Sequence, residues 1–219
     1  MLLYLVKHSR PDIANAVREL SKVLDGASPA AFKEMHRVIK YVLDTKTMGL
    51  KLEPNSFKKA SWDLFCYSDS DYAGNPDTRR SVTGFVLFVR NVPVCWRSKA
   101  QRIVTLSSTE AEWYALSEAV KEVIFVVQLI ESIGIQIQLP VIVRVDNVGA
   151  VFMAKNITTT GRTKHVDIRT KYVNEYVEDG MVKIIFVKTE DNLADCLTKN
   201  LGSSLHTKHS QKMIKLKPE

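Results

Sequence analysis

The order of strand and helix patterns after residue 60 constrains the fold most strongly. Apolar runs predict strands there, and apolar residues at helical spacing predict the helices between them. The expected elements are strands at about 63–69, 83–90, 92–97 and 102–106, a helix at 108–133, a strand at 140–146, helices at 147–155 and 165–179, a strand at 181–188 and a helix at 191–199. Consecutive antiparallel strands followed by alternating strands and helices indicate an α/β fold, with a mixed sheet flanked by helices.

The first 48 residues have a different pattern. Apolar residues at helical spacing follow residue 10, and Ser28 with Pro29 predicts the capped start of a second amphipathic helix. We therefore expect a helical hairpin, joined by residues 49–60 to the domain at 61–201. The segment 202–219 is polar and basic, and we expect a loosely ordered tail.

Four acidic residues fall where the predicted elements meet: Asp69, Glu112, Asp146 and Asp195. Asp69 and Asp146 end apolar runs that predict buried strands, whereas Glu112 and Asp195 lie near the starts of two predicted helices. Carboxylates brought together repel one another unless cations neutralise them. The cluster therefore predicts divalent metal, as in sites that cut phosphodiester bonds with two ions.

Helical phase separates the two glutamates of the segment Ser107–Glu112. Ser107 and Glu110 have the spacing of a capping box, which gives Glu110 a structural role at the helix start. Glu112 instead lies on the apolar stripe that must pack against the sheet, where a carboxylate is costly unless it has a partner.

Two alternatives stay open at this point. Asp69 and Asp71 share one strand face, so either could face the site, and Asp71 is an auxiliary candidate. Asp146 could also act only as the cap of the helix that follows its strand.

Composition and charge limit the class of protein. The chain has a net charge of +7, and it is unevenly spread: residues 1–60 hold 11 basic and 6 acidic side chains, 61–200 hold 16 and 17, and 201–219 hold 4 and 1. Basic flanks around an acidic centre suit a protein that binds polyanions, although solubility explains them equally well. The three cysteines show no CxxC spacing, which favours reduced thiols and disfavours zinc. No apolar run has the length of a membrane span, and we expect no membrane partner.

A set of motifs in the second part of the chain resembles a known family. They are Tyr67–Gly74, Arg79–Phe85, Trp96–Lys99, Leu106–Glu112, Asp146-Asn147, Arg162–Arg169 and Asn192–Asp195. In this order they are similar to the ribonuclease H domain of copia-type retrotransposon polyproteins. Residues 3–43 resemble the last part of the reverse transcriptase that precedes that domain.

The resemblance implies a ribonuclease H-like fold with a mixed five-stranded sheet. It implies that Asp69, Glu112, Asp146 and Asp195 bind two Mg²⁺ ions, with Mn²⁺ as a substitute, and that the chain cleaves the RNA strand of RNA–DNA hybrids. Hard oxygen ligands agree with this choice of metal. It further implies the upstream polymerase domain as a partner. The expected location is intracellular, in the cytoplasm or a virus-like particle, with the nucleus as an alternative.

The chain departs from related patterns in two ways. The loop before Asp195 lacks the histidine that some ribonucleases H carry, so His165 is the nearest candidate to assist product release; a purely structural role is as good an explanation. The segment Tyr67–Asp71 has one residue too many between its acids for a polymerase motif. We expect no polymerase activity from this chain alone.

Basic residues in loops and at strand ends are candidates to contact nucleic-acid phosphates, with a solvated basic surface as the alternative. They are Arg79, Arg80, Arg97, Lys99, Arg102, Arg162 and Lys164. Two other functions compete with the nuclease: a catalytically inactive module that binds nucleic acid or docks to reverse transcriptase, and an integrase or transposase of the same fold. The position of the glutamate on the first long helix disfavours the integrase.

Overall fold

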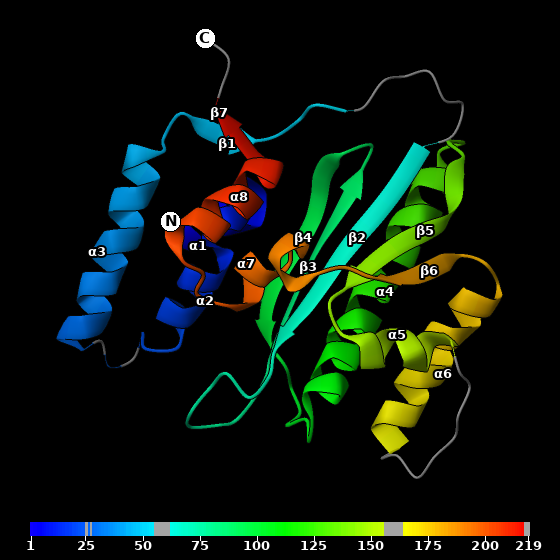
Figure 1. Cartoon of the computed structure of the whole chain (residues 1–219). Coiled ribbons are helices and arrows are strands. Elements are labelled where there is room, and N and C mark those ends of the chain that lie inside the picture. Colours follow the sequence, from blue (N-terminus) through cyan, green and yellow to red (C-terminus); the bar gives the residue numbers. More distant parts are fainter. Residues whose placement is uncertain (25, 27, 55–61, 156–163, 217–219) are drawn as a thin grey trace.

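The computed structural model describes residues 1–24, 26, 28–54, 62–155 and 164–216, apart from the side chains of 155 and 164–167. Its helices are α1 (Leu2–His8), α2 (Ala14–Ser21), α3 (Pro29–Asp44), α4 (Ser108–Ser132), α5 (Val148–Lys155), α6 (Lys164–Glu178), α7 (Asp195–Thr198) and α8 (Ser203–Met213), with 3-10 turns η1 (Pro11–Ile13) and η2 (Thr189–Asp191). Its strands are β1 (Met48–Leu50), β2 (Trp62–Asp71), β3 (Val82–Val89), β4 (Val92–Ala100), β5 (Ile137–Val145), β6 (Val182–Phe186) and β7 (Ile214–Leu216). Figure 1 shows their arrangement.

The central sheet has five strands in the order β4-β3-β2-β5-β6. The strands β2, β3 and β4 pair antiparallel, whereas β5 runs parallel to β2, and β6 runs parallel to β5. This order and these directions confirm the mixed five-stranded sheet of a ribonuclease H-like fold. The carboxyl ends of the neighbouring strands β2 and β5 therefore lie side by side at the same end of the sheet.

Helices cover both faces of the sheet. Figure 1 shows α4, α5 and α6 grouped on one side, and α1, α2, α7 and α8 on the other. Alternate residues of β2 serve the two faces: Leu64 and Cys66 belong to the core beneath α4, and Phe65 and Tyr67 pack against the core that includes Leu197 of α7. The long helix α4 is almost continuously buried along its sheet-facing side, as its apolar stripe predicts.

The N-terminal segment contains the expected helical hairpin, formed by α2 and α3. Ser28 caps α3, with its hydroxyl accepting a hydrogen bond from the Ala31 amide at 3.2 Å. The segment also packs on later parts of the chain: Ala14 joins the α7 core, and the indole of Trp96 on β4 donates a 2.7 Å hydrogen bond to the Val6 carbonyl.

Three expectations about local structure were wrong. Residues 203–216 are not a loosely ordered tail, because they form α8 and β7, bury Met213 and Ile214, and pair with β1. Residues 102–106 form no strand, and Thr105 is instead held by a 2.9 Å contact with the Ser81 hydroxyl. The helix expected at 191–199 is shorter than that, since η2 and a turn at residues 193–194 precede the four-residue α7.

In the part of the chain that the structure describes, no helix combines the length and the apolar character needed to cross a membrane.

Candidate metal centre

Asp69 lies near the end of β2, on the face that α7 covers, and it is fully buried. Its register partner on β3 is Gly84. A Cβ atom on Gly84 would lie 2.5 Å from Thr198 Cγ2 and 3.1 Å from Leu197 Cβ. The absence of a side chain at Gly84 therefore lets α7, which begins with Asp195, lie against the sheet beside Asp69.

Glu112 approaches this end of β2 from the other face of the sheet. Ser107 caps α4 through the Glu110 amide, and the Glu110 carboxylate accepts a hydrogen bond from the Leu106 amide at 2.7 Å. Glu112, one turn into the helix, is 6% exposed. Its Oε1 accepts hydrogen bonds from the amide and the hydroxyl of Ser70, both at 3.1 Å. These contacts confirm the capping role expected for Glu110 and the inward orientation expected for Glu112.

Asp146 follows β5 directly and completes a three-carboxylate cluster. One side-chain oxygen from each of Asp69, Glu112 and Asp146 lies within 4.8 Å of the other two. The buried amide of Asn192 supports this arrangement by donating to Asp146 Oδ1 at 3.3 Å and to the Ser68 carbonyl at 3.0 Å. The strand-end position of Asp146 thus places it in the cluster.

Asp195, the fourth predicted acid, lies beside this cluster and is linked to it by Lys199. The Lys199 ammonium lies 2.9 Å from Asp195 Oδ1 and 3.0 Å from Asp69 Oδ1. The other oxygen of Asp69 accepts a short hydrogen bond from the Thr198 hydroxyl. Sequence reasoning missed both Thr198 and Lys199, although the four-residue spacing from Asp195 to Lys199 is that of an ion pair on a helix.

Crowding of the acids changes their titration. Burial is the main cause that raises the pKa of Glu112 well above its ordinary value, and the charges of Asp69 and Asp146 raise it further. Burial and the Asp69 charge raise the pKa of Asp195 to about 7, against the opposing effect of Lys199. Burial would lower the pKa of Lys199, but the charges of Asp69 and Asp195 raise it above its ordinary value. The site therefore favours additional positive charge.

The donor atoms of this site fit a hard divalent cation. Glu112 Oε2 is buried and has no hydrogen-bond partner among the described residues, although Glu112 belongs to the three-carboxylate cluster. A buried charged oxygen of this kind is costly unless a cation or a donor satisfies it. An all-oxygen donor set suits Mg²⁺ or Mn²⁺ and does not suit zinc.

The remaining site candidates, Asp71, Arg162, Lys164 and His165, are not part of the three-carboxylate cluster as far as the structure describes them. Asp71 is half-buried at the end of β2 and lies outside the three-oxygen cluster; burial raises its pKa. Arg162 lies outside the described residues. The same is true of the side chains of Lys164 and His165, whose backbone begins α6.

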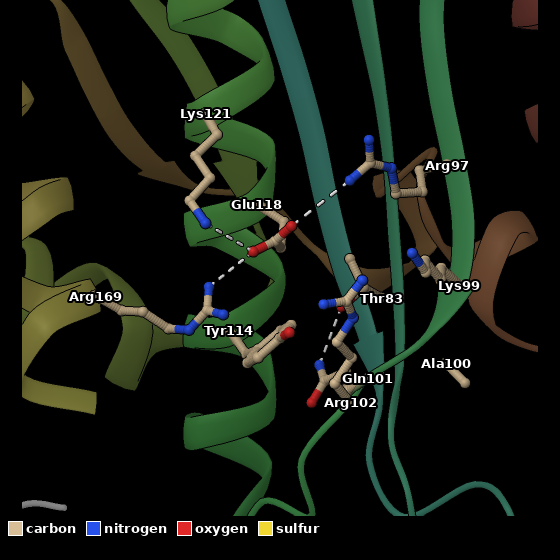
Figure 2. Close-up of a pocket in the computed structure, with 10 residues that line it drawn as sticks. All are labelled: Thr83, Arg97, Lys99, Ala100, Gln101, Arg102, Tyr114, Glu118, Lys121 and Arg169. Atoms are coloured by element: carbon tan, nitrogen blue, oxygen red, sulfur yellow. Dashed lines mark hydrogen bonds and ion pairs between the residues drawn. The ribbon is translucent and has the colours of Figure 1, made fainter. Parts of the chain in front are cut away.

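The basic candidates fall into two groups. Arg97, Lys99 and Arg102 line a cavity of about 370 Å³ between β4, α4 and α6, shown in Figure 2. Arg79 and Arg80 instead lie exposed in the loop between β2 and β3.

Sequence reasoning missed two further cations of this cavity, Lys121 and Arg169. Glu118 lies at the centre, with Oε1 2.9 Å from Arg169 and 3.1 Å from Lys121, and Oε2 3.6 Å from Arg97 Nη1. The Arg169 guanidinium also lies over the Tyr114 ring, 3.8 Å from its centroid. The cavity therefore presents an excess of positive charge around one carboxylate.

No family model matches the chain. Among solved structures, it resembles the N-terminal RNase H domain of a Mycobacterium tuberculosis protein, with a TM-score of 0.48 and 13% identity over 69% of this chain and 98% of that one. Since this score is low, the fold assignment rests on the strand order and directions described above.

Curated relatives match nearly the whole chain. It is 32% identical over 218 residues to the retrovirus-related Pol polyprotein from transposon RE2 of Arabidopsis thaliana, which covers 99% of this chain and 15% of that protein. It is 33% identical over 198 residues to the corresponding polyprotein from transposon TNT 1-94 of Nicotiana tabacum, covering 90% of this chain and 14% of that protein. The chain thus spans about one seventh of the length of these relatives. By this similarity, the chain is related to a segment of copia-type retrotransposon Pol polyproteins.

Proposed function

We propose that this chain is a divalent-metal-dependent ribonuclease H that hydrolyses the RNA strand of RNA–DNA hybrids within a retroelement. The observation that carries the proposal is the convergence of Asp69, Glu112 and Asp146 within 4.8 Å, with one buried glutamate oxygen left without a partner among the described residues. Similarity to retrotransposon Pol polyproteins and the ribonuclease H-like strand order both support a nuclease role in a retroelement.

Asp69, Glu112, Asp146 and Asp195 would hold two Mg²⁺ ions, or Mn²⁺ in their place. Ions bound there supply a water of lowered pKa and stabilise negative charge on the phosphate and the leaving oxygen. The protein's own groups set the geometry: Ser70 orients Glu112, Asn192 orients Asp146, and Gly84 lets α7 bring Asp195 to Asp69. Asp69, Glu112 and Asp195 lie on a strand or a helix, and Asp146 directly follows β5, which favours precise placement of ligands.

The cavity around Glu118 supplies a contact surface for a phosphate backbone. Its cations Arg97, Lys99, Arg102, Lys121 and Arg169 attract polyanions without reading sequence. A hybrid would be recognised by groove shape and 2′-hydroxyls, with these cations fixing its position. Arg79, Arg80, Arg162 and Lys164 stay candidates for further backbone contacts, and His165 for product release.

The direct test is cleavage of a hybrid with end-labelled RNA, in a titration of Mg²⁺ and of Mn²⁺. Asp146→Asn should abolish cleavage, because it removes a charged ligand and leaves the fold in place. Asp179→Asn changes an exposed acid in the turn after α6 and is the matched control. Cleavage that persists in Asp146→Asn would reject the site. Hybrid binding without cleavage in either metal would instead support the inactive binding or docking module.

We also propose that the upstream polymerase domain of the reverse transcriptase is a partner of the N-terminal helices. Leu3, Tyr4, Phe32 and Leu43 are each more than half exposed there. Exposed apolar side chains of this kind are typical of contact surfaces. Co-purification of this chain with a separately expressed polymerase domain tests the proposal, with Phe32→Ser and Leu43→Ser expected to weaken the complex.

A further inference from the structure

Lys199 bridges two of the four acids of the metal centre, Asp69 and Asp195. Its ammonium contacts Asp69 Oδ1 at 3.0 Å and Asp195 Oδ1 at 2.9 Å. The remaining oxygen of Asp69 is engaged by Thr198. Both oxygens of Asp69 are therefore used by neighbours from the end of α7, whereas Glu112 Oε2 has no partner among the described residues.

The two neighbours of Asp69 differ in their freedom to move. Thr198 is 1% exposed, and its hydroxyl also lies 3.1 Å from the Asp195 carbonyl within α7. The Lys199 side chain is 33% exposed, and its backbone is extended, with φ −119° and ψ 153°, because it ends the helix. Lys199 can therefore withdraw its ammonium into solvent, while Thr198 stays fixed.

An ammonium and a divalent cation compete for the same carboxylate oxygens. Each neutralises the repulsion between Asp69 and Asp195, but two cations at the same oxygens repel each other strongly in a buried site. We propose that Lys199 is a positioning residue that acts as an internal counter-cation: it holds Asp69 and Asp195 together in the metal-free protein and is displaced from them when a divalent ion binds. This inference rests on the proposed metal site.

Removing the positive charge of Lys199 should have opposite effects on the stability of the metal-free protein and on its affinity for metal. Loss of the ammonium leaves Asp69 and Asp195 unpaired, so the metal-free protein should be less stable. Loss of the competitor removes the cost of displacement, so metal should bind more tightly, by about tenfold if the displaced state is populated to roughly one tenth in the original protein. A lysine with only a structural role would produce the first effect and not the second.

The experiment uses the full chain without nucleic acid. Lys199→Met keeps most of the length of the side chain and removes its charge, whereas Lys199→Arg keeps the charge. Lys215→Met is the matched control, since Lys215 forms an ion pair with Glu53 next to the β1–β7 pair, away from the acids. The melting temperature is measured in EDTA, and the affinity for MnCl₂ and MgCl₂ by titration calorimetry.

We expect Lys199→Met to lower the melting temperature in EDTA by roughly 5 °C and to bind Mn²⁺ about tenfold more tightly. Lys199→Arg and Lys215→Met should resemble the original protein in both measurements. Unchanged or weaker Mn²⁺ binding by Lys199→Met would overturn the inference while leaving the metal site in place. Absence of Mn²⁺ and Mg²⁺ binding by both the original protein and Lys199→Met would overturn the metal site and the inference together.

Discussion

Gly84 on β3 lies opposite Asp69 on β2, and the space beside Gly84 is filled by Thr198 of α7. The same threonine donates its hydroxyl hydrogen to Asp69. One missing side chain on the sheet therefore sets how closely the helix that carries the fourth acid approaches the first.

Gly84→Ala should disturb this approach. The new Cβ would lie 2.5 Å from Thr198 Cγ2, and Thr198 is too deeply buried to move aside freely. We expect a loss of about 1–3 kcal/mol in the free energy of unfolding, together with a loss of hybrid cleavage larger than the loss of folded protein. Denaturant unfolding and a cleavage assay measure the two effects. Gly49→Ala, where no atom lies within 4 Å of the added Cβ, is the control and should change neither.

The acids of the metal centre should make the metal-free protein less stable as the pH rises. Burial and the Asp69 charge raise the pKa of Asp195 from 3.8 to about 7. The folded state therefore binds more protons than the unfolded state between these values, and its stability falls as pH increases across this window. Glu112, whose pKa is also raised, acts in the same direction.

Melting temperatures in EDTA between pH 5 and pH 8 test this dependence. We expect the melting temperature to fall through the window and the fall to be smaller in Asp195→Asn. Asp179→Asn should follow the original profile. A melting temperature that rises between pH 5 and pH 7 in the absence of metal would contradict the prediction.

The basic cavity should contribute to the affinity for a hybrid in a salt-dependent way. Arg102→Gln and Lys99→Gln each remove one cation from its lining. We expect weaker hybrid binding at low salt and a reduction of about 1 in the slope of log affinity against log salt concentration for each phosphate that the protein no longer neutralises. Lys212→Gln on α8 removes an exposed cation outside this cavity and should leave the slope unchanged. Equal slopes for all three variants would exclude the cavity as a binding surface for the phosphate backbone.

The main features of the fold were predictable because they depend on local patterns, and so was the convergence of acidic residues at one end of the sheet. Asp69 lies near the end of β2 and Asp146 directly follows β5, and parallel strands bring such ends together. Helical phase was enough to separate Glu112 from Glu110. The choice of Asp69 over Asp71 depended on the family motif, and the structure supports it by placing only Asp69 in the cluster.

The features that were missed depend on contacts between distant segments. The segment 203–216 is polar on average, yet it is ordered because β7 pairs with β1, more than 160 residues earlier, and Met213 completes a core with Ala14. The role of Lys199 depends on where a four-residue helix ends. Propensity cannot fix either result, because tertiary packing decides both.

The N-terminal helices should support the metal centre through Arg18 on α2. Its guanidinium donates to Ser98 on β4 at 3.0 Å, to the Thr198 carbonyl at the end of α7 at 3.4 Å, and to Asn15 beside it. These contacts hold α7 between the upstream helix and the sheet. Thr198 in turn contacts Asp69. A substitution of Arg18 should therefore alter the position of the acids, although none of these hydrogen bonds joins Arg18 to an acid.

Arg18→Met retains much of the side-chain volume and removes the donors. We expect a loss of about 1–3 kcal/mol in the free energy of unfolding, since buried acceptors are left without partners, and weaker Mn²⁺ binding in the folded protein. Unfolding and calorimetric titration measure these two quantities separately. Arg37→Met, which breaks only an exposed ion pair with Glu34 on α3, should have little effect on either. If Arg18→Met loses stability but binds Mn²⁺ normally, the N-terminal helices stabilise the fold without positioning α7.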